Sequence, residues 1–234
     1  MTRSSFEDLL RHGAEPKFNY IDPPFNYNSL GVSQYPVEVS GLYLLNILCL
    51  RLGWPSLAGK RLLDFGCGVR FARTIINLGM DIGLYAGVDV NGAAIEWLQS
   101  NVADERFSFT QIAVSNQMYN PANATVADKN LLTNLGLSGF DAACMFSVIT
   151  HQKPDEAELT FATLRECVVP GGALYFTAFI DPEKPGYYEA TPEAPGLHST
   201  YHPDMLVDLV ERGGWQVQAT YARSKFQQAA FVCQ

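Results

Sequence analysis

Two acidic residues and two glycines are the residues of this sequence whose types and spacing could do chemistry. In the segment RLLDFGCGVRFA an apolar run ends at Asp64 and is followed by Gly66 and Gly68. Glycine has no Cβ, so a backbone that carries it can approach a ligand closely. In YAGVDVN a second apolar run ends at Asp89. An acid at the end of a strand can accept hydrogen bonds from both hydroxyls of a ribose.

The spacing of the glycines narrows the class of ligand. A phosphate-binding P-loop needs GxxxxGK followed by Ser or Thr, and the sequence lacks this pattern. A dinucleotide-binding turn has GxGxxG, but Phe71 stands at the third glycine position. The carboxylate of Asp64 disfavours a polyphosphate and suits a positively charged amino group or a bridging water. Taken alone, the stretch is also compatible with a tight strand-to-helix turn that binds nothing.

Short apolar segments alternate with amphipathic ones from Lys60 onward, and this alternation places both acids at strand ends. It predicts a mainly parallel sheet with helices on both faces. Residues 223–225 alone separate the last two apolar segments, a connection too short to cross over, so the final strand is expected to be antiparallel. The predicted strands are 61–65, 83–90, 106–114, 140–149, 172–180, 215–222 and 226–234, and the predicted helices lie near 37–52, 70–79, 92–102, 154–167 and 202–214.

Composition limits the class of protein. The 234 residues suit one α/β domain, which we place at 36–234 after an aromatic-rich arm or lid at 1–35. A net charge of −8 argues against a surface that coats nucleic acid. The first ten residues are polar, and the most apolar run is too short to span a bilayer, so we expect no signal peptide and no membrane partner. The five cysteines form no CxxC pair, which predicts buried free thiols and a cytoplasmic location.

Four segments in order, LLDFGCG, YAGVDVN, FDAACMFSVITH and LRECVVPGGALYFTAF, resemble those of class I S-adenosylmethionine-dependent methyltransferases. The likeness covers about residues 60–234 and is greatest to bacterial small-molecule enzymes that carry SVxTH after the fourth strand. It implies a three-layer sandwich whose doubly wound, seven-stranded, mostly parallel sheet has an antiparallel last strand. It also implies S-adenosylmethionine as the cofactor.

The resemblance implies roles for matching residues. The first loop would surround the methionine part of the cofactor, Asp89 would hold the ribose hydroxyls, and further residues would line the adenine, ribose and methionine. These residues are Asp64, Gly66 and Gly68 in the loop, Val90 and Asn91 beside the adenine or ribose, and Ser147 on the methionine side. Two departures stand out: relatives usually have one more glycine before the Arg, and Ala113 replaces an acid that binds the adenine amine. Asn116 or a backbone group is the expected substitute.

Candidates for acceptor chemistry follow the fourth and fifth strands. His151 could act as a general base, since its unperturbed pKa lies near 6.5, or it could fasten the turn. Asp181, His198 and three neighbours lie in a proline-rich stretch expected to be a binding loop; these neighbours are Tyr187, Tyr188 and His202. We take His151, Asp181 and His198 as the catalytic candidates. The HxxxH spacing of His198 and His202 would suit a metal only if both residues were on a helix, and Pro203 disfavours a helix there. His202 could instead cap the next helix. No metal is therefore predicted.

Several functions fit this pattern. The leading hypothesis is methyl transfer to oxygen or nitrogen of a small-molecule acceptor, without a nucleic-acid partner and with a possible homodimer. The alternatives are a protein or nucleic-acid methyltransferase, a cofactor-binding scaffold or regulatory partner without catalysis, and, more distantly, a nicotinamide dehydrogenase. The segment DPPF, residues 22–25, resembles a motif of DNA amino-methyltransferases, but we interpret it as a turn in the arm. The negative net charge also fits duplex DNA poorly.

Overall fold

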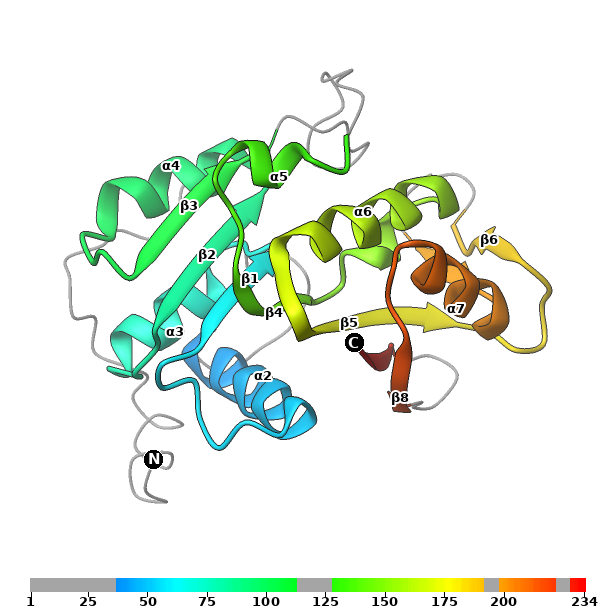
Figure 1. Ribbon diagram of the computed structural model, residues 1–234, viewed down its shortest axis with the longest axis horizontal. Helices are drawn as coiled ribbons and strands as arrows, with labels where there is room; N and C mark the ends of the chain where they lie inside the picture. Colours follow the sequence, from blue (N-terminus) through cyan, green and yellow to red (C-terminus); the bar gives the residue numbers. More distant parts are fainter. Residues whose placement is uncertain (1–36, 113–127, 192–197, 222–227) are drawn as a thin grey trace.

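The centre of the molecule is a sheet of five parallel strands. The computed structural model describes residues 37–112, 128–191, 198–221 and 228–234. β2 and β3 lie on one side of β1, and β4 and β5 lie on its other side, all in parallel pairing (Figure 1). These strands are β1 (Arg61–Phe65), β2 (Leu84–Asp89), β3 (Phe107–Gln111), β4 (Phe140–Met145) and β5 (Val168–Ile180). The predicted arm at 1–35 and the DPPF segment lie outside the described residues.

Two further strands complete the predicted topology. β9 (Ala229–Cys233) pairs antiparallel with β5, and β8 (Val217–Tyr221) pairs antiparallel with β9. The order β3-β2-β1-β4-β5-β9-β8 therefore has seven strands, of which the last in sequence is antiparallel to its neighbours. The predicted sheet is confirmed, because a short connection permits only a hairpin.

The stretch after β5, predicted to be a loop, contains a small hairpin. β6 (Tyr187–Glu189) pairs antiparallel with β7 (Ser199–Tyr201), and β7 pairs in parallel with the end of β5. Each of these two strands has three residues. A run that short shows too little alternation of polar and apolar residues to be seen among prolines.

The helices cover both faces of the sheet and give three layers, as predicted. Alternate strand residues supply the two cores: Leu63 and Phe176 face one set of helices, whereas Leu62 and Tyr175 face the other. The first set is α5 (Leu131–Asn134), α6 (Pro154–Cys167) and α7 (Pro203–Arg212), with α6 and α7 side by side (Figure 1). The second set is α2 (Val37–Leu52), α3 (Arg70–Asn77) and α4 (Gly92–Asn101). All five cysteines are buried and free, as predicted.

β4 ends earlier than the sequence suggested. The apolar run continues to Ile149, but extended backbone stops at Met145, and Ile149–His151 forms a 3-10 turn, η2. The cause is Ser147, which has a φ of 60° and therefore leaves the β region. This turn points the chain away from the sheet at the edge where parallel strands end.

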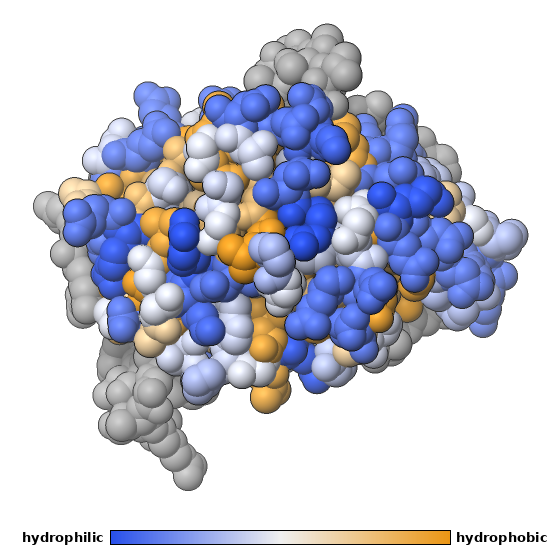
Figure 2. All heavy atoms as spheres, in the orientation of Figure 1, coloured by the Kyte–Doolittle hydropathy of each residue, from blue (hydrophilic) through white to orange (hydrophobic). Residues whose placement is uncertain are grey.

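The face of the molecule seen in Figure 2 carries mostly polar residues. Figure 2 shows one side of the molecule as mainly hydrophilic, with small separated hydrophobic areas. Within the described ranges, no helix combines the length and apolar character needed to cross a bilayer.

A buried polar contact joins α2 to α3. The buried Glu38 accepts hydrogen bonds from Arg73 at 3.2 Å and from Asn77 at 2.9 Å. One turn further along α2, Gly41 lets the two helices approach so closely that an added Cβ would overlap the hydroxyl of Thr74. Position 41 is therefore fixed as glycine by packing, although glycine is a poor helix former.

Gly41→Ala should destabilise the protein by about 1–3 kcal/mol, because the methyl group overpacks the α2–α3 contact and outweighs the better helix propensity of alanine. Chemical denaturation of the variant and the wild type measures the difference. Asn46→Ala, at an exposed position of the same helix, is the control and should be neutral or slightly stabilising. Equal stability of Gly41→Ala and the wild type would contradict the packing account.

Candidate functional site

The two acids lie at the carboxyl ends of adjacent strands. In the parallel register of β1 and β2, Asp64 is opposite Gly87, and Asp89 follows two residues later as the last residue of β2. The loop after β1 folds over the end of β2, where the N–H groups of Gly66 and Cys67 donate to the Val88 carbonyl at 2.7 and 3.1 Å. The acids and the glycine loop therefore share one edge of the sheet.

Asp89 holds two loops together. Its Oδ2 accepts a hydrogen bond from the Gly68 N–H, and its Oδ1 accepts one from the Asn91 N–H, both at 2.8 Å. Burial raises the pKa of Asp89, and the hydrogen bonds from Asn91 and Gly68 oppose that rise. Each carboxylate oxygen can accept a further bond, so hydroxyl groups of a ribose fit this acid.

The glycine loop is shaped for close approach. Gly66 has a φ of 80° and Gly68 has a φ of 48°, both in the left-handed region that favours glycine. A Cβ on Gly66 would lie 2.5 Å from Cγ2 of Val148, in the turn after β4. Position 66 therefore has no room for a side chain. The glycine loop and the acceptor atoms of Asp89 together fit an adenosyl ligand at this edge of the sheet.

Asp64 is more enclosed than the sequence suggested. Its side chain lies on the sheet face that α2 and α3 cover, and the residue is only 3% exposed. The Tyr85 hydroxyl donates to its Oδ2 at 2.5 Å, and the Cys144 thiol donates to its Oδ1 at 3.5 Å. Burial raises the pKa of Asp64 from 3.8 to about 6, against the two hydrogen bonds that lower it. Sequence reasoning missed both partners, which only strand register brings beside this acid.

The remaining cofactor candidates are placed differently from one another. Val90 is half-buried and packs against the core on the α6 side. Asn91 caps α4, with its Oδ1 accepting from the Ala94 N–H at 3.2 Å. Asn116 lies outside the described residues, as does Ala113. The roles proposed for these residues toward adenine or ribose stay predictions.

Ser147 belongs to a polar cluster that the sequence did not reveal. Its N–H donates to the Thr177 hydroxyl at 2.9 Å, and the Gln228 side-chain amide donates to its Oγ at 2.9 Å. A non-glycine residue at a φ of 60° costs about 1–3 kcal/mol and persists where the surroundings hold it. Such strained positions are enriched at functional sites, so the cluster is a candidate for ligand contact.

His151 stands at the end of η2, near the inserted hairpin. Its backbone N–H donates to the Val148 carbonyl at 2.9 Å, and the ring is half-buried. The Tyr201 hydroxyl of β7 donates to the Gln152 carbonyl at 2.6 Å and so joins the hairpin to this turn. This geometry is consistent with His151 as a general base and with His151 as a turn residue.

The other acceptor-side candidates have structural partners. Asp181 is buried and accepts hydrogen bonds from the Tyr188 hydroxyl at 2.9 Å and from the Glu183 N–H at 3.0 Å, so it fastens the start of the hairpin. His198 is exposed, and its Nδ1 lies 3.2 Å from Oγ1 of Thr191.

The remaining hairpin candidates are also engaged. The Tyr187 hydroxyl donates to Glu189 at 3.0 Å. His202 caps α7 by accepting from the Asp204 N–H at 3.3 Å, which confirms the capping interpretation.

The fold and this edge define a doubly wound α/β protein with two acids and a glycine loop at the ends of β1 and β2. A family model described as a methyltransferase domain matches residues 43–220, and the chain therefore belongs to that family. The predicted class, an S-adenosylmethionine-dependent methyltransferase, is confirmed, and with it the predicted cofactor.

Solved structures show the same fold at low sequence identity. A glycopeptide N-methyltransferase, MtfA, solved with S-adenosyl-L-homocysteine, is 14% identical with a TM-score of 0.55 and covers 82% of this chain and 89% of its own. The 1,6-didemethyltoxoflavin-N1-methyltransferase of Burkholderia thailandensis is 18% identical with a TM-score of 0.55, over 84% and 78%. The magnesium protoporphyrin IX methyltransferase of Synechocystis PCC 6803 is 13% identical with a TM-score of 0.54, over 87% and 86%.

The pKa of Asp64 predicts a pH dependence of stability. Because this pKa rises from 3.8 to about 6 on folding, the folded state binds the proton more tightly than the unfolded state. The resulting stabilisation is complete below pH 3.8 and is lost as the pH rises to about 6, about 3 kcal/mol in total. Between these pH values the free energy of unfolding of the wild type should fall relative to that of Asp64→Asn. Urea denaturation of both proteins along this pH range measures it.

Asp208→Asn, which changes an exposed aspartate of α7, serves as the control and should follow the pH curve of the wild type. Parallel curves for Asp64→Asn and the wild type would show that Asp64 titrates normally.

Proposed function

We propose that this protein transfers the methyl group of S-adenosylmethionine to oxygen or nitrogen of a small-molecule acceptor. The observation that carries the proposal is the bond between Asp89 and the Gly68 N–H, which unites the ribose-binding acid and the glycine loop at one sheet edge. In open α/β sheets, ligands bind outside the carboxyl ends of the strands.

Each residue has a stated task in this proposal. Asp89 accepts hydrogen bonds from the ribose hydroxyls and keeps the loop of Gly66 and Gly68 in place. Asn91, and Val90 beside it, border the adenosyl group, while Asp64 lies beneath the loop that faces the methionine part. The cofactor, when bound, supplies a methyl group that its sulfonium has already activated. The protein contributes mainly alignment of the acceptor with that methyl group.

A base is needed only where the acceptor atom must lose a proton. His151 follows β4 at the edge that carries the site, and a histidine can take a proton near neutral pH. A small acceptor is supported by the negative net charge, which disfavours nucleic acid, and by neighbours of the same fold that are named for small acceptors. Another neighbour of the same fold is named as a glycopeptide N-methyltransferase, so nitrogen acceptors belong in the test.

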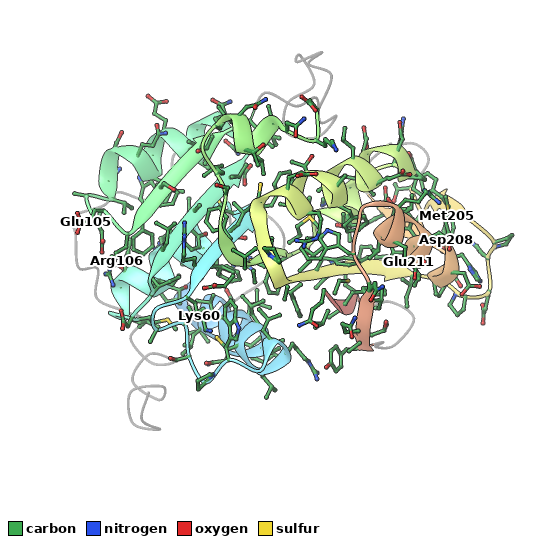
Figure 3. The ribbon with its side chains drawn as sticks, viewed as in Figure 1. Lys60, Glu105, Arg106, Met205, Asp208 and Glu211 are labelled. Atoms are coloured by element: carbon green, nitrogen blue, oxygen red, sulfur yellow. The ribbon has the colours of Figure 1, made fainter. Side chains whose placement is uncertain are left out.

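Calorimetric titration with S-adenosylhomocysteine tests the cofactor site. Asp89→Ala should weaken binding about 10- to 100-fold, because the ribose loses its acceptor and the loop loses the bond to Gly68. Asp208→Ala, at an exposed position of α7 apart from β1 and β2 (Figure 3), should bind like the wild type. An unchanged affinity of Asp89→Ala would remove the ribose role. The absence of any binding by folded wild-type protein would remove the proposed function.

His151→Gln separates the two interpretations of this histidine. If His151 is the base, the turnover number for a proton-bearing acceptor should fall about 100-fold or more, with unchanged affinity for S-adenosylhomocysteine. The rate of S-adenosylhomocysteine formation across pH 5–9 measures this effect and should lose its dependence on a group titrating near neutrality. A variant with a normal rate and a lower melting temperature would instead identify His151 as a turn residue.

A further inference from the structure

Three neutral residues form a closed hydrogen-bonded ring, which we call the polar ring: Ser147 after β4, Thr177 in β5 and Gln228 before β9. The Thr177 hydroxyl accepts from the Ser147 N–H at 2.9 Å and donates to Oε1 of Gln228 at 2.5 Å. Nε2 of Gln228 donates to Oγ of Ser147 at 2.9 Å, and this Oγ lies 3.1 Å from Oε1 of the same amide. Ser147 is exposed and the other two are half-buried, so the ring is open on one side.

The polar ring lies beside the part of the sheet edge that carries Asp64 and Asp89, and its Ser147 is the residue that the resemblance places on the methionine side of the cofactor. Asp64 and Asp89 belong to β1 and β2, whereas the ring follows β4, lies on β5 and precedes β9, on the other side of β1. Val148, next to Ser147, is the residue that packs against Gly66 of the glycine loop. The ring is therefore adjacent to the predicted cofactor loop without being part of it.

The hydrogen bonds already made determine what the ring can still bind. Both acceptor positions of Gln228 Oε1 are used, and its amide group keeps one free N–H among the described residues. The Ser147 and Thr177 oxygens each donate once and accept once, which leaves one lone pair on each. The open side of the ring thus offers one donor beside two acceptors, with no charge on any of its three members.

We propose that the polar ring anchors the methyl acceptor by a neutral group that carries both a donor and an acceptor, such as a carboxamide or a hydroxyl. An anionic group would face two lone pairs without a cation to neutralise it, and a cationic group would face the free N–H without an anion. The strained φ of Ser147 is consistent with this role, because it aims the serine into the ring at the end of β4. The inference rests on the proposed methyl transfer and specifies the acceptor for it.

Nuclear magnetic resonance of the protein saturated with S-adenosylhomocysteine tests the proposal with three probes of one shape: benzamide, benzoate and benzylammonium. The side-chain amide signals of Gln228 are assigned by their loss in Gln228→Glu. Benzamide should shift these signals and should bind at least about tenfold more tightly than either charged probe. Equal binding of the three probes, or benzamide binding that leaves the Gln228 signals unmoved, would overturn the inference. So would the absence of benzamide binding.

The variant Gln228→Glu provides a second test of the proposed preference for a neutral group. A glutamate keeps an acceptor for Thr177 and Ser147 but replaces the free N–H by an anionic oxygen, so the preference should reverse toward benzylammonium by about tenfold. Gln218→Glu adds the same charge at an exposed position of β8 and should keep the preference for benzamide. A reversal in the control would assign the effect to net charge and overturn the inference. If S-adenosylhomocysteine itself fails to bind the wild type, the proposed function fails instead.

Discussion

The site depends on one carboxylate that joins two loops. Asp89 and Gly68 are 21 residues apart in sequence, and the bond between them exists because β1 and β2 pair in parallel register. Parallel pairing brings the ends of both strands to the same edge, where a side chain of one strand can accept from the backbone of the next loop. Two further bonds, from the N–H groups of Gly66 and Cys67 to the Val88 carbonyl, tie the same loop to β2.

Burial of two acids on neighbouring strands has an energetic consequence. It raises the pKa of Asp64 and of Asp89, and the charge of Asp89 raises the pKa of Asp64 further. The protein limits this cost with neutral donors: Tyr85 and Cys144 for Asp64, and backbone N–H groups for Asp89. Buried carboxylates with raised pKa values are common at ligand sites, where the ligand can supply further hydrogen-bond donors.

The sequence pattern predicted the helices and strands, which depend on local residue order. It did not predict the side-chain contacts that depend on the register between strands. Residues 154–167 were predicted as a helix and form α6, and the strand ending in Asp64 was found because an apolar run stops at an acid. Gln228 carries no such signal. It joins Ser147 and Thr177 only because β9 runs antiparallel beside β5, and one residue of slippage would turn its side chain to the other face. The same reasoning explains why Tyr85 was not expected beside Asp64.

Residue type alone does not separate structural from chemical tasks of polar residues near a site. Asp181, which the sequence suggested as a catalyst, is buried and accepts from Tyr188 and Glu183, and His202 caps a helix. These hydrogen bonds show that Asp181 fastens the start of the hairpin, and its catalytic role stays a prediction. The proposed acceptor selection uses the polar ring, which keeps unused hydrogen-bonding capacity at the open edge. Because the members of the ring are neutral, it selects by matching donors to acceptors instead of by charge.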